Sequence, residues 1–212
     1  MQGWLTNDGF FKRLRKDCMK FLVLIVVLLL GMAGYARSVS VQAAPALQIA
    51  RPLLLQANEG ERRVRRVPTK NAGTVPSPFL TIKVDPHNGG TSNVMMLTEH
   101  LKPGGKIPPH RHLHQDEIVY IERGTVHAVV GDQARDIHDG GTIFIPHNTW
   151  VSILGIGTET ISLLAFFNGS DFDAYLRCST VPSGIRASSM TAADRRACAK
   201  AGKAQYRGLY RK

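Results

Sequence analysis

Apolar and polar residues alternate in many short runs through the middle of the 212-residue chain. The period of two residues is typical of a strand that buries one face. Turn-forming sequences such as DPHNGG, KPGG, ERG and HDGG separate the runs. The expected strands are PFLTIKV, NVMMLTEHL, KIPPHRH, EIVYIE, TVHAVV, TIFI, WVSIL and TISLLAFF. No helical pattern lies between them and no repeat of the set is visible, so the sequence predicts a single all-β sandwich or closed barrel over residues 78–168.

The residues on either side of the predicted barrel follow other patterns. Residues 44–77 are rich in proline and turn residues, and we expect an arm with one or two edge strands, such as residues 51–56. Residues 169–212 contain two short segments with helical start signals, which predicts a helical C-terminal extension. Such an extension could cover an open barrel edge or contribute to the surface of a homodimer.

Polar residues at the expected helix starts support this assignment. Ser170 precedes an acidic stretch and could cap the first helix. Thr191 and Asp194 have the spacing of a capping box for the second helix, with Asp in place of the more usual Glu. Gly202 is expected to end that helix.

The N-terminal region has the layout of a secretory signal peptide. A 14-residue apolar run, residues 21–34, follows a basic flank and precedes small residues, with a plausible cleavage site after Ala43. We therefore expect a signal peptide over residues 1–43 and a periplasmic or secreted protein without stable membrane insertion after cleavage. Met19 would begin a signal of more ordinary length and is the expected true start. An uncleaved anchor is the alternative, although the run is short for a membrane span.

The net charge of the chain does not alter this interpretation. Removal of residues 1–43 takes away six of the 27 basic and two of the 16 acidic residues, which lowers the net charge from +11 to +7. The excess lies at the two ends and not across a face interleaved with aromatic residues, so we expect no nucleic acid partner. We interpret it as solvated charge, with weak attraction to anionic surfaces as the alternative. The two basic clusters are Arg62, Arg63, Arg65 and Arg66, and Arg195, Arg196, Lys200, Lys203, Arg207, Arg211 and Lys212.

Cysteine usage fits export. Cys18 lies in the expected signal segment, which leaves Cys178 and Cys198 as an even pair. In an oxidising compartment these two are expected to form a disulfide that joins the two helices. Two buried free thiols are the alternative.

Five residues at fixed spacing carry the strongest chemical signal: Gly104, His110, His112, Glu117 and Gly124. On a strand, the two histidines point to the same face because they are two residues apart. The intervening LHQD can reverse the chain, so that EIVYI pairs back alongside. Two imidazoles and a carboxylate would then converge as a divalent metal requires.

The spacing G-x5-H-x-H-x4-E-x6-G resembles the first motif of the cupin family, which implies an all-β fold, a small cupin or jelly-roll β-barrel. A second cupin motif begins here with Gly140 and Pro146. Asn148 stands at its next Gly position and can accept left-handed backbone angles. Val151 stands where the family has a fourth metal ligand, a His, and Gly155 where it has an Asn.

The resemblance implies a metal site of His110, His112 and Glu117. A two-His, one-carboxylate set can hold Fe(II) or Mn(II) with open positions for ligands, while Zn(II) or Ni(II) could also occupy it. The missing fourth ligand leaves a second reading, in which the motif persists without a metal.

Other polar residues have weaker signals. His114 and His147 are expected near the rim of the barrel, each with an alternative role as ligand or proton shuttle. His127 is expected to be packed or solvent-facing. Glu99 and Tyr120 could support the ligands from behind.

Two functions fit these observations. The first is a metal-dependent dioxygenase that acts on a small organic substrate, phenolic or enolic, as the similarity to quercetinase-like bacterial cupins implies. The alternative is a non-catalytic module that binds a small molecule or serves an assembly, with a degenerate metal site. The apolar Val151 favours the alternative.

Overall fold

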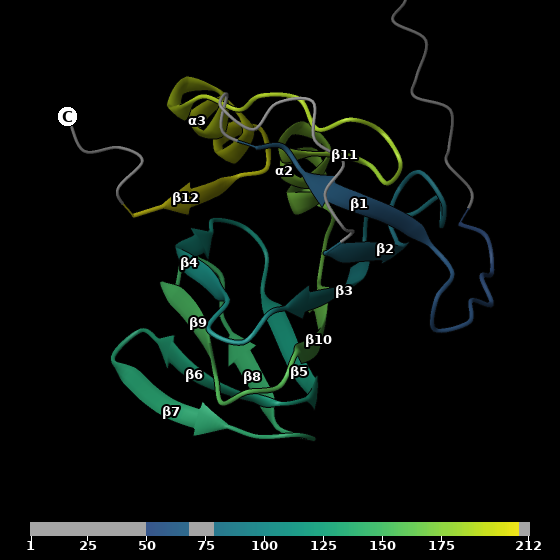
Figure 1. Cartoon of the computed structure of the whole chain (residues 1–212). Helices are drawn as coiled ribbons and strands as arrows, with labels where there is room; N and C mark the ends of the chain where they lie inside the picture. Colours follow the sequence, from purple (N-terminus) through teal and green to yellow (C-terminus); the bar gives the residue numbers. More distant parts are fainter. Residues whose placement is uncertain (1–49, 68–78, 208–212) are drawn as a thin grey trace, which may run out of the picture. The chain divides into compact units, whose positions relative to one another are not determined.

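The computed structural model describes residues 50–67 and 79–207, which contain twelve strands and two helices (Figure 1). The expected signal segment and its cleavage site lie outside these residues, as do parts of the arm and the last five residues. Neither helix of the described chain has the length and apolarity needed to cross a membrane.

Two antiparallel sheets account for the strands, and they confirm the all-β prediction. The first sheet has the order β11-β1-β2-β3-β10-β5-β8, and the second has the order β12-β4-β9-β6-β7. The strands of the first sheet are β11 (Thr180–Pro182), β1 (Glu61–Arg65), β2 (Leu80–Val84), β3 (Met95–Leu101), β10 (Ile161–Phe167), β5 (Glu117–Arg123) and β8 (Thr142–Ile145). Those of the second are β12 (Ala204–Tyr206), β4 (Lys106–His112), β9 (Val151–Ile156), β6 (Thr125–Val130) and β7 (Gln133–Ile137).

The core lies between the sheets and follows the alternation read from the sequence. In β10, the buried residues Ile161, Leu163, Ala165 and Phe167 alternate with partly exposed neighbours. Inward residues of the second sheet, such as Ile153 of β9, join the same apolar cluster. Burial of these large side chains is the main force that holds the sheets together.

Outside the C-terminal extension, two strand assignments differ from the sequence expectation. Strand β7 was not expected, because its residues are exposed or only partly buried and show no apolar alternation. Residues 51–56 form no strand; the arm's strand is β1. In residues 51–56 three leucines are consecutive instead of alternating, and the Lys83 ammonium group binds the carbonyl oxygens of Gln56 and Ala57, at 3.0 and 2.7 Å.

The two predicted helices form, as α2 (Asp171–Ser179) and α3 (Ala192–Ala201). The capping box of α3 is confirmed: the Asp194 N–H donates to Thr191 Oγ1, and the Thr191 N–H donates to the Asp194 carboxylate. Gly202 ends α3 as expected.

The start of α2 differs from the expectation. The Ser170 side chain makes no capping hydrogen bond. Instead, the Phe172 N–H donates to Gln115 Oε1 over 2.9 Å. Gln115 belongs to the loop between the expected metal ligands, so this bond ties α2 to that loop.

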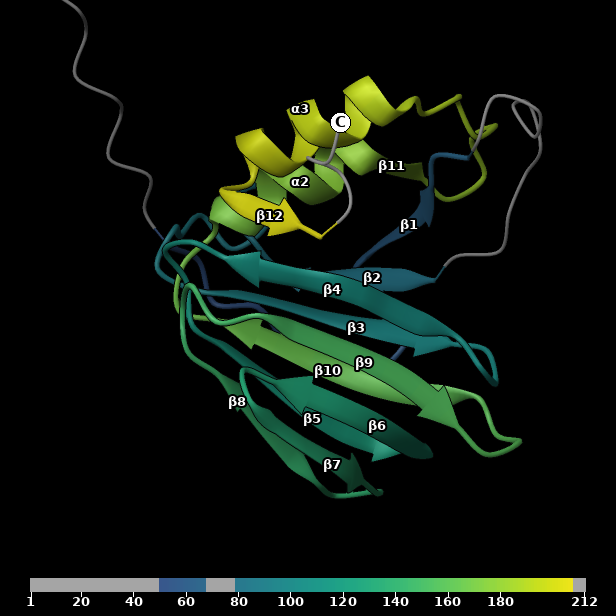
Figure 2. The same ribbon diagram turned by 90° about the vertical axis from the view of Figure 1, so that its left-hand side faces the viewer.

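A disulfide joins Cys178 of α2 to Cys198 of α3, which confirms the predicted pair. The extension also adds one strand to each sheet, because β11 pairs with β1 and β12 pairs with β4. Figure 2 shows α2 and α3 along this side of the two sheets, next to β12, β4 and β2. The C-terminal residues therefore cover one edge of each sheet.

Candidate metal centre

The two histidines of the motif lie on β4 and face the interior. His110 is 4% exposed and His112 is 2% exposed, as expected for residues two apart on one face of a strand. Glu117 is the first residue of β5 and is 7% exposed. The expectation that its run pairs back alongside β4 is wrong, because β5 pairs with β10 and β8 in the other sheet. The loop LHQD crosses between the sheets, so the three side chains meet in the core.

The three side chains lie close enough to share one cation. One ligand atom from each of His110, His112 and Glu117 lies within 4.8 Å of the other two. His112 Nε2 and Glu117 Oε2 are 3.4 Å apart. Ligand atoms about 2.0–2.2 Å from a common metal ion have separations of this order.

Buried polar atoms without partners point to the same use. Both ring nitrogens of His112 and Oε2 of Glu117 are buried and accept or donate no hydrogen bond. Such groups are rare in proteins because desolvation without a compensating partner costs about 1–3 kcal/mol each. A divalent cation would satisfy a nitrogen and the oxygen at once, so the donor set fits a metal.

His110 is held in an orientation that suits a ligand. Its Nδ1 lies 2.9 Å from the carbonyl oxygen of Pro108, which can only accept, so we place the proton on Nδ1. The lone pair is then on Nε2. Burial, reinforced by nearby His112, lowers the pKa of His110 to about 4, which keeps the ring neutral at physiological pH.

The position of the family's fourth ligand is apolar in this structure. Val151 is 1% exposed and is paired with His110 across β4 and β9. His147 does not replace it: its side chain is 63% exposed and its Nδ1 lies 2.9 Å from Asp116. Asn148 adopts a φ of 61°, which confirms that it takes the left-handed turn position.

The remaining sequence candidates lie in different places. His114 is exposed and pairs with Asp171 near the start of α2, and His127 has a half-exposed side chain that contacts Asp136. Tyr120 is 41% exposed. Glu99 lines the same cavity as His110 and Glu117.

A small cavity of about 60 Å³ lies beside the ligands. His110, Glu117 and Glu99 line it from the sheets, while Phe172, Tyr175 and Tyr206 line it from the C-terminal extension. The sequence offered no signal for the extension's part in this wall, because the contacts join segments far apart in the chain. An aromatic residue on a short helix is ordinarily interpreted as core packing.

Arg65 lies at the edge of this cavity. Its guanidinium group donates to Glu99 Oε1 over 2.8 Å and lies 3.9 Å above the ring of Phe79. The Arg65 side chain is 49% exposed, whereas that of Glu99 is 12% exposed. Burial raises the pKa of Glu99, Arg65 opposes this, and the charge of Glu117 adds to the increase.

The expectation of solvated charge in the first basic cluster is wrong for Arg63. This residue is 5% exposed, and its Nε donates to Thr180 Oγ1 at the end of α2. Arg65, in the same cluster, lines the cavity. Arg63 and Arg65 are two residues apart on β1, so the alternation of the strand does not separate these two roles.

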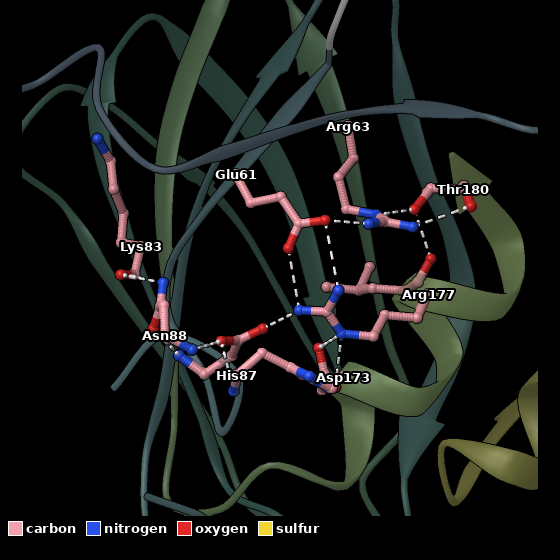
Figure 3. Close-up of polar contacts among 10 residues, drawn as sticks. Glu61, Arg63, Lys83, His87, Asn88, Asp173, Arg177 and Thr180 are labelled. Carbon is pink, nitrogen blue, oxygen red and sulfur yellow. Dashed lines mark hydrogen bonds and ion pairs between the residues drawn. The ribbon is translucent and has the colours of Figure 1, made fainter. Parts of the chain in front are cut away.

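A network around Arg177 anchors α2 to the first sheet (Figure 3). Its guanidinium group forms ion pairs with Glu61 of β1, with the buried Asp85 after β2, and with Asp173 one turn earlier in α2. Asp85, His87 and Asp173 also lie close enough to hold a cation. Because Arg177 already pairs with both aspartates, we assign this group to the anchoring of α2.

The comparisons with known proteins agree with the motif. Residues 97–167 match a family model described as cupin domain. A search of curated proteins found no match to the chain.

Among solved structures, three similar ones come from bacteria. KdgF from Halomonas sp. is 20% identical, with a TM-score of 0.38, over 43% of this chain and 79% of that one. A predicted oxalate decarboxylase from Thermotoga maritima is 18% identical, with a TM-score of 0.43, over 56% of this chain and 99% of that one. An RmlC-like cupin from Shewanella frigidimarina is 15% identical, with a TM-score of 0.38, over 43% of this chain and 75% of that one.

Proposed function

Residues 97–167 are a cupin domain, and on that premise we propose that the chain is a metal-dependent dioxygenase of a small organic substrate. His110, His112 and Glu117 would hold one divalent cation. The observation that carries the proposal is the set of buried, unpartnered ligand atoms on His112 and Glu117. These atoms are costly in a folded protein unless a cation binds them.

The donor set favours Fe(II) or Mn(II), with Zn(II) or Ni(II) as possible occupants. When bound, such a cation would act as a Lewis acid with open positions for substrate and dioxygen. The side chains of this protein contribute orientation and a dry environment. Pro108 fixes the His110 ring, and Val151 keeps the side of the missing fourth ligand apolar.

The cavity bears on the substrate. Its volume of about 60 Å³ is far below the roughly 300–1,000 Å³ of typical small-molecule sites. A phenolic ring would require the wall to move, so the cavity favours smaller organic molecules than the phenolic class inferred from the sequence. Glu117, as ligand, and Glu99, across the cavity, are the carboxylates available to accept a proton.

Metal analysis combined with oxygen uptake tests this proposal. Protein loaded with Fe(II) or Mn(II) should consume dioxygen with small organic acids or enols, and the His112→Ala variant should not. His127→Ala is the matched control, because His127 is a half-exposed histidine that contacts Asp136 outside the site. Metal-loaded protein that consumes no dioxygen with any such compound would contradict the dioxygenase.

The second candidate is a binding module without turnover. The apolar, buried Val151 favours it, since three protein ligands hold a cation less firmly than four. In that case the metal-loaded protein would bind small molecules, seen as spectral shifts, and would leave them unchanged.

We also propose that the protein is exported to the periplasm or secreted. The Cys178–Cys198 disulfide supports this, because disulfides persist in oxidising compartments. Mass spectrometry of the mature protein should find an N-terminus close to residue 44. A chain that retains residues 21–34 in the membrane fraction would favour an anchor.

Self-association is a further part of the proposal. Ile118 of β5 and Phe144 of β8 are paired across the sheet and are 40% and 58% exposed. Apolar side chains in register on an open sheet face are suited to pairing with a second copy. Light scattering tests this, and a monomer at high concentration would exclude it.

A further inference from the structure

The last strand of the described chain lies directly against the ligand strand. In the pairing of β12 with β4, Ala204 is opposite His112 and Tyr206 is opposite His110. Inward residues of β12 therefore lie beside both histidines. The first-motif spacing contains no information about this strand, which belongs to the extension.

Aromatic rings of the extension form a continuous wall on this side. Tyr206 stacks on His110, with ring centroids 5.3 Å apart, and Phe172 contacts the edge of His112 at 4.5 Å. Tyr175 stacks on both Phe172, at 4.9 Å, and Tyr206, at 5.3 Å. We call Phe172, Tyr175 and Tyr206 the aromatic wall.

The aromatic wall is fixed at several points. The Cys178–Cys198 disulfide holds α2 to α3, and Arg177 holds α2 to the first sheet. Gln115 binds the backbone of Phe172 from the ligand loop. A wall with these attachments resists displacement, so its position limits what can enter.

The space that remains is small, and the charges of Arg65 and Glu99 at its edge balance each other in an ion pair. A cavity needs roughly 10–15 Å³ to hold one water molecule, so the volume of about 60 Å³ leaves room for a ligand of about four heavy atoms. Arg65 and Pro108, both exposed, mark the open side. A divalent cation with the one carboxylate of Glu117 would have a net charge of +1, which favours an anion at its open positions.

We propose that the aromatic wall is the size filter of the metal centre, and that it restricts the ligand to small anions of about four heavy atoms or fewer. The inference rests on the proposed metal site. It goes beyond that proposal because it assigns substrate selection to Phe172, Tyr175 and Tyr206, which lie outside both motifs and outside the matched cupin domain.

The test uses the mature protein loaded with Co(II), whose visible spectrum reports ligands at the open positions. Acetate and benzoate share a carboxylate and differ in size, while acetamide matches acetate in size without the charge. Wild-type protein should bind acetate at least tenfold more tightly than benzoate or acetamide. Tyr206→Leu and Phe172→Val should each raise benzoate affinity at least tenfold and leave Co(II) stoichiometry unchanged. Tyr120→Leu, on an exposed tyrosine outside the cavity, is the matched control.

The outcomes separate the two proposals. Failure of wild-type protein to bind Co(II) or any other divalent cation would overturn the metal site, and the filter with it. Cation binding with equal affinity for acetate and benzoate in wild-type protein would overturn the filter alone. If Tyr206→Leu does not fold, Phe172→Val decides the question from the other end of the wall.

Discussion

The ring of Tyr206 lies parallel to that of His110, with an interplanar angle of 16° and centroids 5.3 Å apart. One residue belongs to the ligand strand of the cupin domain and the other to the final strand of the extension. Tyr206 belongs to the buried core cluster, so the contact helps to bury His110. The C-terminal residues therefore complete the candidate site as well as covering one edge of each sheet.

A fourth ligand can be restored at Val151. The Val151→His variant should bind the divalent cation about tenfold more tightly or better, because another imidazole would replace a weaker water ligand. Calorimetric titration measures this. Ser152→His, one residue along the same strand and on its other face, is the matched control. A Val151→His variant that folds and binds the cation no better than wild-type protein would show that Val151 does not face the ligands.

The stability of the metal-free protein should depend on pH through His110. The pKa of His110 is lowered in the folded state to about 4, below its ordinary value of 6.5, so the unfolded chain binds more protons between these values. The contribution of His110 to the free energy of unfolding is therefore fully present above about pH 6.5. It is lost as the pH falls toward 4, and the total loss is about 3 kcal/mol.

The His110→Asn variant provides the comparison. Asn cannot titrate in this range, and its side-chain N–H can still reach the carbonyl group of Pro108. Urea unfolding at pH 7, 5.5 and 4.5 should show a smaller loss of stability in this variant than in wild-type protein. Equal slopes in the two proteins would contradict the low pKa of His110.

The disulfide should stabilise the extension. Its two cysteines are 20 residues apart, for which loop-closure entropy predicts about 3 kcal/mol. The double variant Cys178→Ser, Cys198→Ser should unfold at correspondingly lower denaturant concentration than oxidised wild-type protein. Reductant should destabilise wild-type protein by a similar amount and leave the variant unaffected. Free thiols in wild-type protein purified without reductant would exclude the bond.

The Arg177 network should be important for the attachment of α2. Arg177→Met would leave the buried Asp85, at 1% exposure, without its charged partner. The free energy of unfolding should fall by about 2–3 kcal/mol, because breaking a buried ion pair leaves a charge without a partner in the interior. Thermal unfolding measures it, with the exposed Arg195→Met in α3 as the control. Equal stability of the two variants would show that Asp85 is not held by Arg177.

Much of the barrel was predictable because its strands alternate between sharp turns. Strands β4 and β6 begin and end at the residues expected from KIPPHRH and TVHAVV. Strand β7 was missed because an exposed edge strand has no apolar face to reveal it. The helix starts of the extension were predicted from local polar residues. For α3 the prediction is confirmed by its capping box.

The candidate ligands were also predictable, because their spacing is local. His110 and His112 share a face of one strand, and Glu117 follows after a short loop. The aromatic wall around them was not predictable from the sequence, because Tyr206 reaches His110 only through the tertiary pairing of β12 with β4. Similarly, no local signal separates the cavity residue Arg65 from the buried Arg63.

The central claim is that His110, His112 and Glu117 bind a divalent cation, and the metal content of the purified protein tests it most directly. Protein prepared from the exported fraction without chelator should contain about one divalent ion per chain, and His112→Ala should contain almost none. His127→Ala should match wild-type protein. A metal-free wild-type protein, whose thermal stability is unchanged by added Fe(II), Mn(II), Zn(II) or Ni(II), would contradict the account.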